Sequence, residues 1–303
     1  MGRDEARRTT SGAGIRAATP SGARPLRIVH CFRAPVGGLF RHVRDLAGAQ
    51  AAAGHSVGII ADASTGGDKA EAAFAALAPR LALGIHRLPM RRDIAPSDIA
   101  AAFRLTGEVR KLNPDVLHAH GAKGGAYART IGTFLRATGH RVARIYTPHG
   151  GSLHFDARSL KGRIYFAAER AFARMTDAFV FVCHYEADAF AAKVGTARRP
   201  TTVAYNGLRP EEFTPVEPWA GARDFLFIGE MRDLKGPDTL IEALALMRDS
   251  EGRGPTAVMV GDGPDKARYI AMVAERGLDS DVVFQDAMPA RDAFALARTV
   301  VLP

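Results

Sequence analysis

Short apolar stretches alternate with longer amphipathic stretches from Leu26 onward. The first, LRIVHCF, precedes a Gly-containing loop and a segment with Leu39, Val43 and Leu46 at helical spacing. Stretches that are apolar throughout predict strands buried on both faces of a parallel sheet, with helices between them. The predicted strands cover residues 26–32, 56–62, 85–90, 115–120, 141–150, 177–183 and 201–207, and the helices residues 39–54, 97–112, 124–138, 160–176 and 184–194.

The pattern is interrupted once and then restarts. Residues 208–222 are rich in proline and acidic residues, which is typical of a linker. The fold class predicted is α/β, with two tandem Rossmann-like, doubly wound parallel sheets: an N-terminal domain over residues 26–207 and a C-terminal domain over residues 223–303. Residues 1–25 read as a disordered leader. Strands are predicted over residues 225–230, 256–263, 281–286 and 299–303, with helices between them.

The C-terminal domain is predicted to be incomplete. It has about four strands, whereas a doubly wound nucleotide-binding unit commonly has six. No helix follows the last predicted strand, so we expect Pro303 to be a truncation point, with an exposed sheet edge that favours aggregation.

Composition and charge narrow the choice of partners. The 303 residues are 47% hydrophobic and 24% charged, and their net charge is +9. No run approaches the ~18 apolar residues of a membrane span, and the leader lacks the apolar core of a secretory signal. The basic charge fits an anionic membrane surface or a phosphorylated substrate. Nucleic acid is not expected, because helix-turn-helix, zinc-finger and aromatic-rich basic patterns are missing.

The cysteines indicate a reduced, cytoplasmic setting. Cys31 and Cys183 are far apart, and each ends an apolar run. This spacing argues against a disulfide framework or a zinc site. We predict buried thiols at strand ends rather than a thiol catalyst next to His184.

Polar residues gather where predicted strands end, which is where open α/β sheets bind ligands. Gly37 and Gly38 stand between a strand and a helix, so their backbone N–H groups can meet a phosphate. His118 and His120 lie two apart in a strand and face one side, and His149 follows another strand. Such histidines act as acids or bases or orient a hydroxyl, the alternative being a structural role. A metal is not expected, since no carboxylate is paired with them.

Two cations stand on a short turn of the C-terminal domain. Arg232 and Lys235 follow the strand in FLFIGEMRDLKG and precede an amphipathic helix. One arginine can bind two phosphate oxygens at once, and lysine adds a mobile charge. Together they can stabilise a leaving diphosphate without a metal ion. The alternative is an ordinary solvated turn.

Seven motifs in order resemble the family-4 glycosyltransferases of the GT-B fold. They are PVGGLFRHVRDLA, PDVLHAH, YTPHGG, TDAFVFVC, VAYNG, FLFIGEMRDLKG and VMVGDGP, and the resemblance runs from Leu26 to Pro303. It implies transfer of a sugar, with retention, from a nucleoside-diphosphate sugar held between two Rossmann-like domains, with no cofactor.

The resemblance also implies roles for single residues. The loop of Gly37 and Gly38 would approach the donor diphosphate, and Arg232 with Lys235 would hold that diphosphate as it leaves. His149 would lie at the reacting sugar, and Gly261 would shape the nucleotide loop. The acceptor-side candidates are His118, His120 and Lys123.

Two departures from the family pattern matter. Glu230 stands where the family usually has arginine, and Arg232 follows two positions later. The family's two glutamates, seven residues apart, would come just after Pro303. We therefore expect the full-length protein to be a hexosyltransferase and this fragment to be inactive.

The acceptor is left open. Residues 87–93 and the basic helix with Lys161, Arg163, Arg170 and Arg174 could face a lipid-linked acceptor or the inner membrane surface, or could simply be solvated. Cell-surface polysaccharide or glycolipid synthesis is the usual setting of the family. The alternatives are a sugar-nucleotide epimerase, a catalytically dead binding or scaffold protein, and a nonspecific polyanion binder.

Overall fold

The structure, a computed structural model, describes residues 24–91, 97–248 and 254–303. The chain divides into two compact units between Gly207 and Leu208, and each is described by itself. Nearly all of the predicted leader lies outside the described residues. None of the helices described here is both long enough and apolar enough to cross a bilayer.

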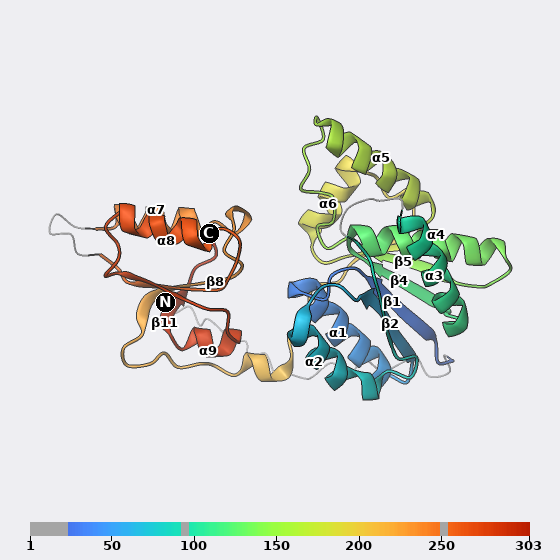
Figure 1. Ribbon diagram of the computed structural model, residues 1–303, viewed down its shortest axis with the longest axis horizontal. Helices are drawn as coiled ribbons and strands as arrows, with labels where there is room; N and C mark the ends of the chain where they lie inside the picture. The colour runs from blue at the N-terminus through green and yellow to red at the C-terminus, as the bar shows by residue number, and fades with distance from the viewer. Residues whose placement is uncertain (1–23, 92–96, 249–253) are drawn as a thin grey trace, which may run out of the picture. The chain divides into compact units, whose positions relative to one another are not determined.

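The first unit is built on a seven-stranded parallel sheet in the order β3-β2-β1-β4-β5-β6-β7 (Figure 1). The chain winds outward from β1 to β3 and then returns to place β4 beside β1. The carboxyl ends of β1 and β4 therefore flank a topological switch point, where sheets of this kind bind ligands. The strands are β1 (Arg27–Phe32), β2 (Ser56–Asp62), β3 (Ile85–Leu88), β4 (Val116–His120), β5 (Ala143–Thr147), β6 (Ala178–Phe181) and β7 (Thr201–Val203).

Helices cover both faces of this sheet, as strands without alternating polarity require. One apolar core forms between the sheet and α1 and α2, and a second forms between the sheet and α3 to α6. The helices are α1 (Gly37–Ala52), α2 (Gly67–Leu77), α3 (Ser97–Leu112), α4 (Gly121–Ala137), α5 (Leu160–Arg174) and α6 (His184–Lys193), with a 3-10 turn, η1 (Ala78–Arg80), after α2.

Helix α4 lies unusually close to the sheet. A Cβ atom at Gly124 would fall 2.6 Å from Cα of Phe32, and one at Gly132 would fall 2.7 Å from Cγ of Arg144. Only glycine permits this approach, which brings the start of α4 directly behind the end of β4.

The second unit has a four-stranded parallel sheet in the order β10-β9-β8-β11. Helices α7 and α8 share one apolar core with the sheet, and α9 packs on the other face. Its switch point lies between β8 and β11, so the loop after β8 is the place for a ligand. The elements are η2 (Pro210–Phe213), β8 (Arg223–Ile228), η3 (Asp233–Lys235), α7 (Pro237–Leu246), β9 (Ala257–Val260), α8 (Lys266–Glu275), β10 (Val282–Gln285), α9 (Ala290–Phe294) and β11 (Ala297–Val300).

The segment predicted as a linker packs against the second unit. The backbone N–H of Trp219 donates to the carbonyl oxygen of Ala295 over 3.0 Å. Nη1 of Arg291 donates to the carbonyl oxygens of Glu211 and Thr214. These bonds tie the segment to α9 and the chain that follows it.

The predicted fold class is confirmed, with corrections in detail. Helix α2 was missed, and α4 begins three residues earlier than predicted. The last strand ends at Val300, whereas the prediction extended to Pro303. Cys183 is not a buried strand end: it is half-buried and caps α6, where its Sγ accepts a hydrogen bond from the N–H of Glu186.

Candidate functional site

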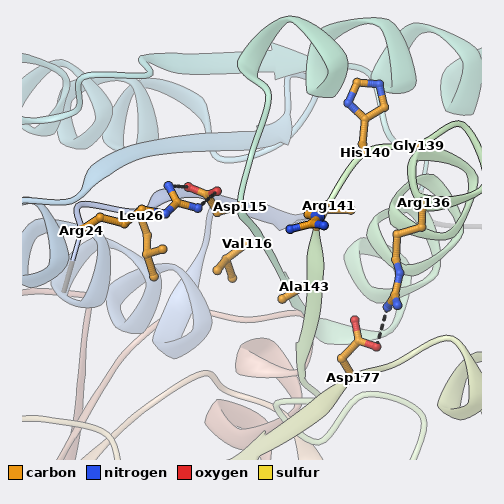
Figure 2. Close-up of a pocket in the computed structure, with 11 residues that line it drawn as sticks. Arg24, Leu26, Asp115, Val116, Arg136, Gly139, His140, Arg141, Ala143 and Asp177 are labelled. Atoms are coloured by element: carbon orange, nitrogen blue, oxygen red, sulfur yellow. Dashed lines mark hydrogen bonds and ion pairs between the residues drawn. The ribbon is translucent and has the colours of Figure 1, made fainter.

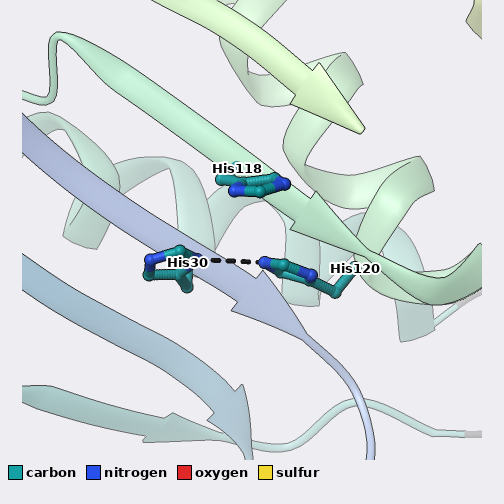
Figure 3. Close-up of side chains that lie close together, drawn as sticks. All are labelled: His30, His118 and His120. Carbon is teal, nitrogen blue, oxygen red and sulfur yellow. Dashed lines mark hydrogen bonds between the residues drawn. The ribbon is translucent and has the colours of Figure 1, made fainter. Parts of the chain in front are cut away.

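Five histidines gather beside the switch point of the first unit, between the sheet and α1. The register of β1 with β4 places His30 next to His118 (Figure 3). His118 and His120 face the same side, as strand alternation predicts, with ring centroids 4.1 Å apart. His42 of α1 and His149, which follows β5, complete the cluster, their ring centroids lying 4.9 Å apart.

Hydrogen bonds join three of these rings in a row. Nε2 of His30 lies 2.8 Å from Oε1 of Gln50, and Nδ1 of His30 lies 3.0 Å from Nε2 of His120. Nδ1 of His120 lies 3.1 Å from Nε2 of His149. The row runs from α1, across the sheet, to the loop after β5.

The remaining two histidines bond outside the row. Nε2 of His118 lies 2.9 Å from Oγ1 of Thr147. His42 shares a side-chain hydrogen bond with Asn206, which brings the VAYNG motif to the cluster. The cluster is therefore held by residues from five separate parts of the first unit.

The loop of His149 is fixed by a buried carboxylate. His149 has φ of 51°, in the left-handed region that non-glycine residues seldom adopt. The next N–H, that of Gly150, donates to Oε1 of Glu186 over 2.5 Å, and the N–H of Val182 donates to Oε2 over 2.9 Å. Glu186 is 4% exposed and so clamps the His149 loop to the turn before α6.

Burial keeps the cluster neutral. It lowers the pKa of His30 and of His149 to about 4, with the charge of His42 acting in the same direction. Burial, together with the neighbouring histidines, lowers the pKa of His118 and His120 well below the usual range. Near pH 7 these imidazoles each have one donor and one acceptor nitrogen, suited to orienting a hydroxyl.

The same side chains include two sets that could reach one metal ion. In the part of the chain that the structure describes, one set is His30, His118 and His120, and the other is His42, His120 and His149. In each set the ligand nitrogens lie within 4.8 Å of one another, and three imidazoles without a carboxylate are a known zinc ligand set. In both sets, however, His120 already bonds a neighbouring histidine through each ring nitrogen.

The two glycines predicted to meet phosphate begin α1. Gly37 has φ of +62°, and the space where a Cβ atom would project from Gly37 or Gly38 is open. The first turn of α1 contains no acidic residue. Lys123 lies in the first turn of α4, with Nζ 5.6 Å from the ring centroid of Tyr127.

In the second unit, two loops at the carboxyl end of the sheet are joined backbone to backbone. A Cβ atom at Gly261, where φ is +150°, would lie 1.9 Å from the carbonyl oxygen of Gly229, and one at Gly263 would lie 2.5 Å from that of Met231. The N–H of Met231 donates to the carbonyl oxygen of Asp262 over 2.9 Å. Glycine is therefore required at both positions. The two loops, which follow β8 and β9, form one rigid surface that we call the ledge.

The two cations stand on this ledge. Arg232 pairs with Glu230, with Nη1 3.4 Å from Oε2, and both side chains are about half exposed. Lys235 is exposed, and no described residue forms an ion pair or side-chain hydrogen bond with it. Gly236 follows with φ of +67° and starts α7. Lys235 is thus the cation best placed to take an external anion.

The structure corrects the prediction for one of the two basic surfaces, residues 87–93. Arg87 turns inward: its guanidinium donates to the carbonyl oxygens of Asp62 and Thr65 and pairs with Glu71. Residues 92–93 lie outside the described residues. On α5, Lys161, Arg163, Arg170 and Arg174 are all exposed, beside the exposed Leu160 and Ile164.

A hollow lies at the opposite end of the first sheet. Arg24 and Asp115 pair across one side of it at 2.6 Å, and Arg136 and Asp177 across another at 2.9 Å (Figure 2). It opens at the amino ends of the strands, where sheets of this class do not bind their ligands. Its acidic groups already have cationic partners, so we place the candidate site at the histidine cluster.

Sequence reasoning missed several residues of the cluster, namely His30, His42, Gln50, Glu186 and Asn206. One signal was available, because His30 occupies an alternate position in the first predicted strand, as His118 and His120 do in theirs. Their proximity depends on which strands pair, which the alternation does not reveal.

A family model described as Glycosyltransferase Family 4 matches residues 36–212, more than half of the chain. The chain belongs to this family. A second model, described as glycosyl transferases group 1, matches residues 210–303. The predicted family is therefore confirmed, and each unit of this family-4 chain is matched by one of the two models.

Individual relatives of the chain also have the names of glycosyltransferases. The chain is 26% identical over 215 residues to a putative glycosyltransferase, EpsD, of Bacillus subtilis, covering 65% of this chain and 54% of that protein. It is 31% identical over 135 residues to the 2-deoxystreptamine glucosyltransferase of Streptomyces kanamyceticus, covering 41% of this chain and 35% of that one. This family-4 chain thus spans about half, or less, of the length of these curated relatives.

Solved structures show the same fold. HepE of Anabaena, determined in complex with UDP and glucose, superposes with a TM-score of 0.69 at 16% identity, covering 91% of this chain and 73% of that one. WaaG, a glycosyltransferase involved in lipopolysaccharide biosynthesis, gives a TM-score of 0.64 at 18% identity, with 91% and 74% covered. At these identities both structures show the fold of this family-4 chain alone.

Proposed function

We propose that this chain forms part of an enzyme that transfers a sugar, with retention, from a nucleoside-diphosphate sugar to an acceptor hydroxyl. The observation that carries the proposal is the tandem match of the family-4 and group 1 models, one on each unit. The binding of UDP and glucose by HepE supports a nucleotide-sugar donor.

On this proposal the donor diphosphate binds the ledge of the second unit. Lys235, exposed and without a partner among the described residues, supplies the first positive charge. Arg232 supplies the second once the diphosphate displaces the exposed carboxylate of Glu230. Gly261 gives the loop near the nucleotide its shape. Two cations can neutralise a leaving diphosphate, so we propose that no metal is needed.

The first unit would supply the sugar-side and acceptor-side groups. His149, neutral and at the surface end of the cluster, would contact the reacting sugar, and Gly37 and Gly38 would offer backbone N–H groups to the diphosphate. His118 and His120 are 6% and 0% exposed, so they would support His149 from below. Lys123 remains the acceptor-side candidate that a ligand can reach.

We also propose a role in cell-surface polysaccharide or glycolipid synthesis at the inner face of the cytoplasmic membrane. Helix α5 supports this, since four exposed cations stand beside exposed Leu160 and Ile164, a pattern suited to an anionic lipid surface. A catalytically dead scaffold is the alternative function.

The deciding experiment is a titration of the chain with nucleoside diphosphates. We expect saturable binding of one of them, weakened about tenfold by Lys235→Ala, because a charge-assisted phosphate contact contributes about 1.5 kcal/mol. Arg276→Ala, which removes an exposed cation from the far end of α8, is the matched control and should not change the affinity.

Two further results bear on the proposal. Binding that disappears steeply with salt and does not distinguish nucleotides would reject it in favour of a polyanion binder. Release of sugar from a labelled donor separates the transferase from the scaffold, and the anomeric configuration of the product tests retention.

A further inference from the structure

One set of three rings in the histidine cluster is spaced as the ligands of a single metal ion are. The set is His42, His120 and His149, whose ligand nitrogens lie within 4.8 Å of one another. When three imidazoles bind one zinc ion tetrahedrally at about 2.05 Å, their nitrogens lie about 3.3 Å apart and their ring centroids about 5.2 Å apart. In this set the centroid spacings are 4.9, 5.3 and 5.8 Å. The three rings therefore already stand close to the spacing that a metal requires.

The other set, His30, His118 and His120, does not have this arrangement. The rings of His118 and His120 lie one over the other, with centroids 4.1 Å apart and 34° between their planes (Figure 3). Ligand rings radiate from the ion that they share, whereas stacked rings point their nitrogens side by side. All three residues of this set are also buried, while His42 and His149 are half-buried and can be reached from solvent. The geometry thus favours the half-buried set.

The hydrogen bond between His120 and His149 lies where the metal would bind. Nδ1 of His120 lies 3.1 Å from Nε2 of His149, so one proton stands between two nitrogens. This spacing is within a few tenths of an ångström of that of two nitrogens on one zinc ion, so an ion can replace the proton with little movement. The ring that held the proton then carries it on its other nitrogen, and both rings stay neutral. The lost hydrogen bond costs about 1 kcal/mol, which is small beside the free energy of binding zinc.

Neighbouring residues hold the three rings in place. Histidines that bind a metal are usually oriented by a hydrogen bond at the nitrogen that does not touch the ion. Nε2 of His120 has such a partner, since it lies 3.0 Å from Nδ1 of His30. Asn206 bonds the ring of His42, and the third ring lies in the loop that the buried carboxylate clamps. Burial also lowers the pKa of all three rings, so the neutral form, which binds metals, is present near pH 7.

We propose that His42, His120 and His149 form a binding site for one divalent transition-metal ion of the zinc class, with the fourth position open to water. Imidazole nitrogens suit zinc, whereas magnesium prefers oxygen ligands. Three histidines and one open position are the ligand set of zinc sites that bind a water molecule or a substrate group. The site goes beyond the proposed diphosphate contacts of Arg232 and Lys235, for which no metal is proposed.

The test is zinc binding by the full chain, freed of metal with a chelator, with zinc chloride as the only added ligand. Equilibrium dialysis with metal analysis should find one zinc ion per chain, which excess magnesium does not displace. X-ray absorption of the bound ion should show three imidazole nitrogens and one oxygen at about 2.0–2.1 Å. His42→Ala and His149→Ala, each at a half-buried position, should weaken zinc binding by more than about a hundredfold, since losing a ligand costs more than losing a residue that orients one.

His154→Ala is the matched control, since His154 lies between β5 and α5 as His149 does but is exposed and outside the set. It should leave the zinc affinity unchanged. The proposal is overturned if the wild-type chain binds no zinc, if His42→Ala binds it unchanged, or if His154→Ala weakens it equally. An absorption spectrum with fewer than three imidazoles also overturns it, and that measurement needs no variant to fold. None of these readouts uses a nucleotide, so failure here is distinct from failure of the proposed sugar transfer.

Discussion

In the first unit, polar side chains near the carboxyl ends of the strands are buried, whereas in the second unit they are exposed. His120 is 0% exposed, while the Arg232 side chain is 44% exposed. The first unit holds its side chains in place through hydrogen bonds to one another. The second unit has a rigid backbone ledge and exposes its cations to solvent.

This difference matches two kinds of chemistry. A group that orients a hydroxyl gains from a fixed geometry, because misplaced donors and acceptors lose most of their effect. A group that neutralises a diphosphate works as a charge and tolerates movement. Burial of an unpaired cation would also be costly, which favours leaving Lys235 in water.

The largest effect is expected from the buried ion pair of the first unit. Arg129 is 0% exposed, and its Nη2 lies 2.9 Å from Oε2 of Glu169, whose other oxygen accepts from the hydroxyl of Tyr146. Arg129→Met leaves a buried carboxylate without a cation, so the free energy of unfolding of this unit should fall by about 4 kcal/mol. Urea unfolding followed by hydrogen exchange in each unit measures it.

The control is the double variant Arg129→Met with Glu169→Gln, which keeps an acceptor for Tyr146 but removes the charge. It should recover most of the loss. A single variant within 1 kcal/mol of the wild-type protein would show that water reaches the carboxylate, and would contradict the buried pair.

The next largest effect is expected from acid, which should lower the stability of the first unit but not that of the second. The folded state lowers the pKa of His30 to about 4, so the unfolded chain binds more protons between pH 6.5 and pH 4. Stability of the first unit should therefore be greatest above pH 6.5 and fall toward pH 4, by roughly 3 kcal/mol from His30 alone. Urea midpoints measured across this range test it.

The second unit is the internal control for this effect. All ten histidines precede residue 208, so it has none. Its carboxylates with a lowered pKa, such as Asp224 beside Thr256, lose their contribution only as the pH falls below the ordinary value of 3.8. Equal losses in both units between pH 6.5 and pH 4 would contradict the assignment to histidine.

A smaller loss is expected where the ledge of the second unit is disturbed. Gly261→Ala forces a Cβ atom against the carbonyl oxygen of Gly229 and strains a positive φ, so this unit should lose about 2–3 kcal/mol. Its urea midpoint should fall while that of the first unit stays unchanged. Gly229→Ala, whose Cβ would meet only the Phe227 ring at 3.4 Å, is the matched control.

The smallest effect is expected from the exposed pair on the ledge. Glu230→Gln removes a carboxylate that competes for Arg232, so diphosphate affinity should rise about threefold, in line with the small contribution of exposed ion pairs. Calorimetric titration detects this change. A fall in affinity would mean that Glu230 itself contacts the ligand.

The sequence allowed both sheets to be predicted, because strands such as β2 and β9 have apolar interiors and need no long-range information to be recognised. Helix α2 was missed because alanines fill five of its eleven positions and obscure the spacing of Ala70, Phe74 and Leu77. His149, Arg232 and Lys235 could be singled out, since each lies in the segment between a strand and the helix after it.

The interactions of these residues could not be predicted. The row from Gln50 to His149 joins residues about a hundred positions apart, and it depends on the register of β1 with β4 and on the packing of α1. Likewise, nothing in the sequence shows that Arg87 turns inward while Lys235 does not. Contacts between residues that are far apart in the sequence decide which partners these side chains have.

The backbone hydrogen bond from Trp219 to Ala295, the residue that ends α9, ties an optical reporter to the second unit. Trp219 is the one tryptophan of the chain and lies in the unit without histidine. Its fluorescence therefore follows one unit while imidazole resonances follow the other. Two spectroscopic signals from unlabelled residues can thus tell whether the halves of this protein melt together or one after the other.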